Sequence, residues 1–151
     1  MLGHLKVFFS RSEYLATAAG FFLLGFLFGN WATLIPYIKT TFSLNDATLG
    51  LLLLCMPIGT MTFNPIAARL IQKFGLKTMT IFGMIFLSVA YLIPFLIISL
   101  YILPVTLVTV GIGMTMLNIS INILAISLER KYEQFIMSTC HGMFSVGLMI
   151  G

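Results

Sequence analysis

The sequence predicts an all-α transmembrane protein, a bundle of helices that cross a lipid bilayer. Of its 151 residues, 60% are hydrophobic and only 8% are charged, whereas about 25% of the residues in a soluble domain are charged. Long uncharged runs alternate with short segments that carry the charge. Helices satisfy their own backbone hydrogen bonds, so such runs cross a bilayer as helices. The lipid bilayer is therefore the first expected partner.

The first two predicted helices span residues 14–38 and 47–68. These runs lack charge over 25 and 22 residues, and about 20 apolar residues are enough to cross the hydrocarbon core. Pro36 is expected to end or bend the first helix, because proline removes a backbone donor. A polar link over 37–46 then supplies N-cap residues for the second helix.

The next uncharged run, residues 78–128, is 51 residues long. A single helix of that length would measure about 76 Å, more than twice the ~30 Å hydrocarbon core, so the run must cross twice. We predict helices over 78–99 and 103–128. Pro104 is suited to the first turn of the second of these helices.

A charged loop over 129–134 leads to a fifth predicted helix over 135–151. This last run has 17 residues, which is marginal for crossing a bilayer. We therefore expect residues 1–151 to be the N-terminal portion of a longer protein.

The basic segment Arg69–Lys77 fixes the predicted topology. It holds three of the eight basic residues and is predicted to be a loop between the second and third helices. With a cytoplasmic N-terminus, the inner segments hold seven basic residues and the outer links hold only Lys39. Basic residues collect on the cytoplasmic side. We therefore expect a multi-pass protein of the plasma (inner) membrane, with its N-terminus in the cytoplasm.

Other classes of protein are excluded by composition. The net charge of +4 is explained by cytoplasmic loops, so no nucleic-acid partner is expected. Cys55 and Cys140 lie in apolar runs, where thiols act as small packing residues. The sequence holds no nucleotide-binding loop, metal-ligand cluster or nucleophile triad. We expect neither an enzyme nor a cofactor or metal.

The basic segment resembles the loop between helices 2 and 3 of the major facilitator superfamily. The family pattern is Gly, three residues, Asp, a basic residue, any residue, Gly, any residue and two basic residues. Lys73, Gly75 and Lys77 match this pattern. Ala68 stands in place of the first glycine, and Gln72 stands in place of the acid.

Three further segments resemble the YbjJ-like branch of this superfamily, near the fucose permeases. They are Gly25–Pro36, Leu49–Leu53 and Ile136–Gly147. The resemblance implies a twelve-helix transporter of two six-helix halves, of which this chain holds helices 1 to 4 and part of helix 5. It also implies secondary active transport of a small polar solute, such as a sugar, by alternating access.

Within the predicted helix 103–128, small and polar residues fall on one stripe. At about 100° per residue, the stripe holds Gly111, Thr115, Asn118, Asn122 and Ala125. Amides that face lipid are costly, so the stripe must face other helices or a watery cavity. One interpretation is contact between helices through amide hydrogen bonds. The other is a wall of the solute cavity, with Asn118 and Asn122 as binding residues.

Asn30, Trp31 and His141 are the other candidates for binding the solute. The amide of Asn30 both donates and accepts hydrogen bonds. Trp31 is either an interfacial anchor or a platform on which a sugar ring stacks. His141 is either a neutral histidine bonded between helices or a functional ionisable group. No Asp or Glu lies inside a span, so a proton is a candidate coupling ion only through His141 or residues outside this chain.

The rival hypothesis is a small multi-pass membrane scaffold or subunit without transport activity. It would oligomerise through the stripe and through Gly25 and Gly29, which are spaced for close helix packing. Gly142, Gly147 and Gly151 are likewise expected to be packing contacts.

Overall fold

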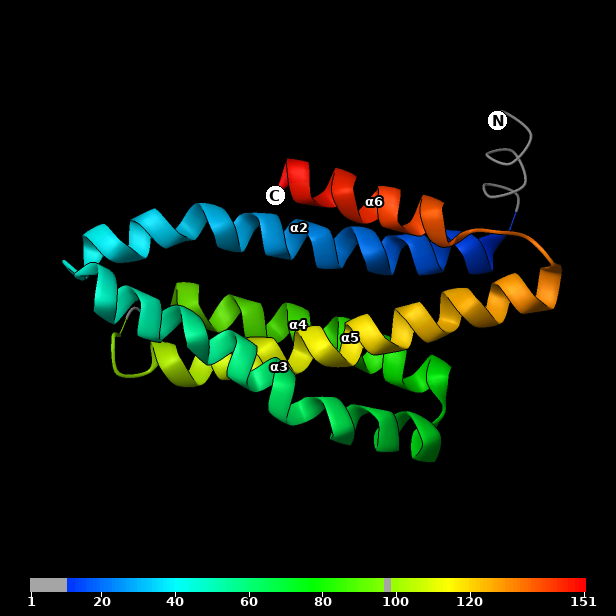
Figure 1. Cartoon of the computed structure of the whole chain (residues 1–151), viewed down its shortest axis with the longest axis horizontal. Coiled ribbons are helices and arrows are strands. Elements are labelled where there is room, and N and C mark those ends of the chain that lie inside the picture. The colour runs from blue at the N-terminus through cyan, green and yellow to red at the C-terminus, as the bar shows by residue number, and fades with distance from the viewer. Residues whose placement is uncertain (1–10, 97–98) are drawn as a thin grey trace.

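The computed structural model describes residues 11–96 and 99–151, and it contains five helices, labelled α2 to α6 (Figure 1). Their bounds are Ser12–Thr41 (α2), Asp46–Phe74 (α3), Leu76–Leu96 (α4), Leu103–Tyr132 (α5) and Met137–Ile150 (α6). Four of the described helices, α2 to α5, are long and apolar enough to cross a membrane, and α6 is shorter. The predicted all-α transmembrane bundle is confirmed. Lys6 and residues 97–98 of the predicted third helix lie outside the described residues.

The predicted basic loop is wrong, because α3 and α4 are separated by a single residue, Gly75. The N–H of Gly75 donates to the carbonyl of Ile71 at 2.9 Å, and the carbonyl of Gly75 accepts from the N–H of Met79 at 3.1 Å. Its φ of +83° is a conformation that glycine adopts without steric cost. Lys73 therefore lies in the last turn of α3, and Lys77 lies in the first turn of α4.

Two other helices also continue past their predicted ends. α2 runs through Pro36 to Thr41, and α5 runs through most of the charged segment to Tyr132. Charge marks the point where a helix leaves the lipid, and a helix can continue in water beyond that point. The predictions therefore located the spans but misplaced the helix ends.

Two predicted helix starts are confirmed. The Asn45 side chain caps α3, because its Oδ1 accepts from the N–H of Thr48 at 2.8 Å. Pro104 lies in the first turn of α5, where its missing N–H would have no helical partner.

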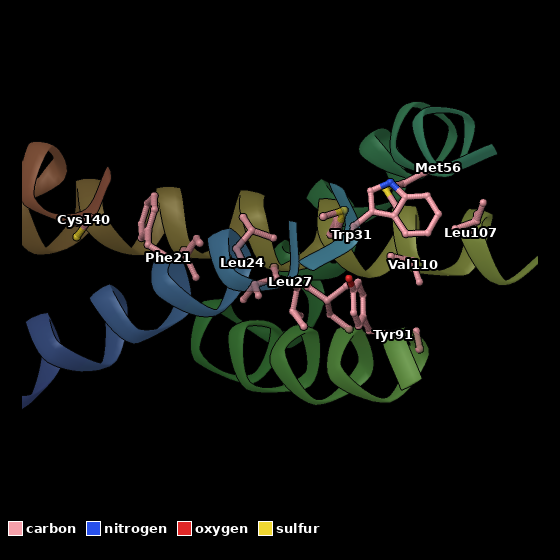
Figure 2. Close-up of a cluster of buried hydrophobic side chains, with 14 of the residues drawn as sticks. Phe21, Leu24, Leu27, Trp31, Met56, Tyr91, Leu107, Val110 and Cys140 are labelled. Carbon is pink, nitrogen blue, oxygen red and sulfur yellow. The ribbon is translucent and has the colours of Figure 1, made fainter. Parts of the chain in front are cut away.

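The bundle consists of two tight helix pairs, α2 with α6 and α3 with α5, and α4 packs mainly against α5 (Figure 1). α5 contacts every other described helix. Figure 2 shows the buried side chains of α2 directed toward α5, with Phe21, Leu24 and Leu27 following one another along α2. The core therefore runs along α5, and the other helices surround it.

Glycines set the contact between α2 and α6. A Cβ on Gly25 would overlap the carbonyl oxygen of Phe144, and one on Gly147 would overlap that of Phe22. Gly29 and Gly151 meet backbone in the same way. The predicted packing role is confirmed for these four glycines and is wrong for Gly142, which has open space where a Cβ would lie.

The contact between α3 and α5 uses one glycine from each helix. A Cβ on Gly59 would overlap the carbonyl oxygen of Val108, and one on Gly111 would overlap that of Met56. Both pairs of helices are thus packed backbone to backbone, which small residues permit in membrane helices.

Hydrogen bonds to two carboxylates connect helices at the end of the bundle where α2 begins and α5 ends. The Glu13 carboxylate accepts from Lys131 Nζ at 3.1 Å and from the hydroxyl of Tyr132 at 2.7 Å. The Glu129 carboxylate accepts from the N–H groups of Ile136 and Met137 at 2.7 and 2.8 Å. These bonds tie the start of α2 and the start of α6 to the end of α5.

Candidate functional site

A cavity of about 620 Å³ lies between the two tight helix pairs. Residues of α2, α3, α5 and α6 form its wall. They are Leu24, Phe28, Thr60, Met61, Asn64, Met114, Thr115, Asn118, Ile119, Asn122, Ile123, Ile126 and Phe144. α4 contributes no residue to this lining.

The structure brings Asn118 and Asn122 together at this cavity, one turn apart on α5. Nδ2 of Asn122 donates to the backbone carbonyl of Asn118 at 2.8 Å and to its Oδ1 at 2.6 Å. A primary amide has two N–H hydrogens, so both donors of Asn122 are engaged. The Nδ2 donors of Asn118 and the Oδ1 acceptor of Asn122 are left for another partner. This pair therefore offers a bound molecule donors and an acceptor side by side.

Two threonines complete the polar edge where α3 and α5 meet. The hydroxyl of Thr115 donates to the backbone carbonyl of Thr60 at 3.2 Å. The hydroxyl of Thr60 donates to the carbonyl of Pro57 at 2.7 Å. Both protons are used within the protein, so these hydroxyls retain only acceptor positions for a ligand.

Asn64 of α3 is a further amide in the lining that sequence reasoning missed. It lies four residues after Thr60, which places both on one face of α3. The signal was present, since Asn64 is an amide inside an uncharged run, as Asn118 is. Amide spacing along one helix does not report which amides of different helices face the same cavity.

The rest of the wall is apolar, and none of the lining residues carries an ionisable side chain. Phe28 and Phe144 contribute aromatic rings from α2 and α6, and Met61 and Met114 contribute thioethers from α3 and α5. Aromatic and aliphatic walls with a few polar groups are typical of small-molecule sites. The arrangement suits an uncharged molecule that has an apolar face and a hydrogen-bonding edge.

Asn30 and Trp31 do not line the cavity. The Oδ1 of Asn30 accepts a long hydrogen bond of 3.4 Å from the hydroxyl of Tyr91. Trp31 is 7% exposed, and Figure 2 shows its indole in the core beside Met56. The structure therefore places both residues where helices pack against one another.

His141 also lies outside the cavity lining. Its ring meets Phe21 edge to face, with 5.1 Å between the ring centroids. The side chain is exposed and lies one turn before Phe144, which does line the cavity. Its functional role stays a prediction.

The matched loop residues Lys73, Gly75 and Lys77 form the turn between α3 and α4 and contribute nothing to the cavity lining. Within residues 11–96 and 99–151, no three His, Cys, Asp or Glu side chains are grouped to hold a metal ion.

The chain is similar to known membrane proteins over most of its length. A profile described as the Major Facilitator Superfamily matches residues 17–151. The chain is 33% identical over 140 residues to an uncharacterized MFS-type transporter of Yersinia pestis, covering 93% of this chain and 36% of that protein. It is 32% identical over 136 residues to the membrane protein MosC of Rhizobium meliloti, covering 90% and 33%.

A third relative is an uncharacterized transporter of Sinorhizobium fredii, 32% identical over 141 residues and covering 89% of this chain and 36% of that protein. No solved structure matches the chain. The chain thus spans about a third of the length of the curated relatives it matches.

Proposed function

This chain belongs to the major facilitator superfamily, and from that premise we propose that it is part of the N-terminal half of a secondary transporter. In the whole protein two six-helix halves would rock about a site near the middle of the membrane. α2, α3, α5 and α6 would then be helices 1, 2, 4 and 5, and their cavity would be this half's share of the solute path.

The cavity is the observation that carries this proposal. Its amides offer donors and an acceptor in one place, and a hydroxyl group both donates and accepts. Phe28 and Phe144 offer aromatic faces against which an apolar ring face can pack. We propose a small uncharged polar solute, with sugars as the first class to test. The likeness to the branch near the fucose permeases points the same way and stays a prediction.

Coupling to a proton is a secondary proposal. His141 is the candidate because it is the ionisable side chain closest along α6 to the lining residue Phe144. A histidine ring can both accept and donate a proton. We expect uptake by His141→Gln to lose the pH dependence of the unaltered protein. Unchanged pH dependence would exclude His141 as the proton carrier.

The proposed orientation places the N-terminus in the cytoplasm of the inner membrane. Single cysteines at Lys73 and Lys77 test it, because the proposal expects them to react with membrane-impermeant reagents only after the cells are opened. Labelling of intact cells would reverse the topology.

The decisive test of the site is Asn118→Leu in the whole protein. We expect uptake of labelled neutral monosaccharides and polyols to fall at least about tenfold. The leucine side chain is similar in size to asparagine but cannot form the hydrogen bonds of the Asn118 amide. Asn30→Leu is the matched control, since Asn30 lies outside the lining, and it should retain most of the uptake. Normal uptake by Asn118→Leu would remove this residue from the site.

The rival scaffold hypothesis loses one of its predicted contact surfaces. Gly25 and Gly29 pack against the backbone of α6 within the same chain. They are therefore closed to a second copy in this structure. A solute flux that depends on Asn118 would exclude the scaffold hypothesis.

A further inference from the structure

A second hollow, of about 380 Å³, lies beside the turn between α3 and α4. Its lining consists of Leu70, Phe74, Thr78, Met79, Phe82 and Met116. We call it the α3–α4 groove. Phe74 and Phe82 are both 51% exposed, so the apolar wall is open to its surroundings. In a membrane protein those surroundings include lipid acyl chains.

Three exposed cations, Arg69, Lys73 and Lys77, directly precede the lining residues Leu70, Phe74 and Thr78 in the sequence. Nζ of Lys73 lies 5.1 Å from the centroid of the Phe74 ring, and that ring forms part of the groove wall. The Lys73 ammonium therefore lies directly beside an apolar hollow.

Two basic residues elsewhere in the described chain are neutralised by carboxylates. Lys39 pairs with Asp46, and Lys131 pairs with Glu13. No ion pair in the described residues involves any of the three cations at the groove. Gln72, which precedes Lys73, is uncharged. The mouth of the groove is therefore complementary to an anion.

The start of α4 adds to this charge complementarity. The N–H of Met79 donates to the carbonyl of Gly75. The N–H groups of residues 76 to 78 precede it in the first turn of α4, where backbone N–H groups have no acceptor within the helix. Such a turn attracts anions, and Thr78 itself lines the groove.

We propose that the α3–α4 groove binds one anionic phospholipid from the adjacent membrane leaflet. Lys73, Lys77 and the first turn of α4 hold the phosphate, and an acyl chain lies along the groove. Lys77 and Phe82 are five residues apart on α4, which is about 7.5 Å along the helix axis. An acyl chain that follows the groove over this distance passes from the level of the lipid headgroups into the hydrocarbon region.

The test is native mass spectrometry of the protein released from mild detergent, titrated with phosphatidylglycerol or phosphatidylcholine of identical acyl chains. Each basic residue near the surface favours an anionic lipid, and two such residues together amount to an expected preference of about tenfold or more. Equal binding of the two lipids by the unaltered protein would overturn the proposal.

The double variant Lys73→Gln with Lys77→Gln should lose this preference. Arg130→Gln is the matched control, because Arg130 is an exposed cation on α5 that lies outside the groove lining, and it should retain the preference. Equal loss in the double variant and in the control would show diffuse attraction to surface charge and overturn a specific site.

Thr78→Trp tests the groove itself. Thr78 is exposed, so the protein can accommodate the indole without refolding, and the indole should fill the groove. We expect the affinity for phosphatidylglycerol to fall at least about tenfold. Unchanged affinity in this variant would place the lipid elsewhere. Displacement of the lipid by millimolar inorganic phosphate would indicate a simple anion site and would overturn the proposal.

A dimer that dissociates in the Thr78→Trp variant would show that a second copy of the chain occupies the groove. This result would also overturn the proposal.

Discussion

The α2–α6 pair and the α3–α5 pair are packed by the same device but differ along their length. α2 and α6 meet through two glycines on each side, over the second half of α6 and the residue that ends it. α3 and α5 meet through one glycine from each helix, and the contact then gives way to the amides and threonines of the cavity. The α2–α6 pair is packed backbone to backbone at four glycines, whereas the α3–α5 pair is packed in this way only at one end and borders the cavity at the other.

This difference shows how one fold combines rigidity with a binding surface. The glycine contacts of α2 and α6 bring backbone against backbone and leave no room for a ligand. A polar wall needs room for the molecule that completes its hydrogen bonds, because an unsatisfied amide in a membrane is costly. Added side-chain volume in the α2–α6 contact should therefore lower stability. Loss of hydrogen-bonding groups at the open end of α3–α5 should lower uptake of the solute.

The largest expected effect is on the closed seam. Gly147→Ala places a Cβ against the carbonyl oxygen of Phe22, and overpacking of this kind costs about 3 kcal/mol. We expect a lower melting temperature and a smaller monodisperse peak in detergent size-exclusion chromatography. Gly142→Ala is the control on the same helix, since open space surrounds that position, and it should be neutral. If both variants melt alike, the seam is not rigid.

A smaller effect is expected at the open end. Asn64→Leu removes one amide from the cavity wall, and one neutral hydrogen bond contributes about 0.5–1.5 kcal/mol, up to roughly tenfold in uptake by the whole protein. The melting temperature should not fall, because Asn64 is exposed. Thr62→Val on the same helix, outside the lining, should transport normally. A destabilised but active Asn64→Leu protein would contradict the distinction between the two regions.

The smallest effect is expected where closed and open regions of α3–α5 meet. Thr115→Val removes the bond from Thr115 to the carbonyl of Thr60. Interhelical hydrogen bonds in membranes contribute about 0.6 kcal/mol on average. Thr109→Val on the same helix removes only a local bond to Val105, so it is the control in the same thermal melts. Equal stability of the two variants would show that the Thr115 bond does not hold the pair together.

Sequence reasoning succeeded where one side chain's chemistry restricts its surroundings. Asn118 and Asn122 were placed at a cavity or a helix contact because an amide cannot face lipid cheaply, and the structure places both at the cavity. The helix count also followed, because the length of an uncharged run fixes the number of crossings.

The remaining features depend on how helices rotate and pack, which periodicity within one helix does not report. Trp31 and Asn30 face the packed core, although their types suit a binding site equally well. Asn64 faces the cavity because of the rotation of α3 against α5. Helix ends were misplaced for a related reason: Gly75 alone breaks the chain between α3 and α4, and charge does not report such a break.

The one-residue break at Gly75 limits how α3 and α4 can shift. Adjacent Cα atoms are about 3.8 Å apart, so the last turn of α3 and the first turn of α4 stay within a few ångströms of each other. A displacement of the end of α3 along the membrane normal therefore carries the start of α4 with it.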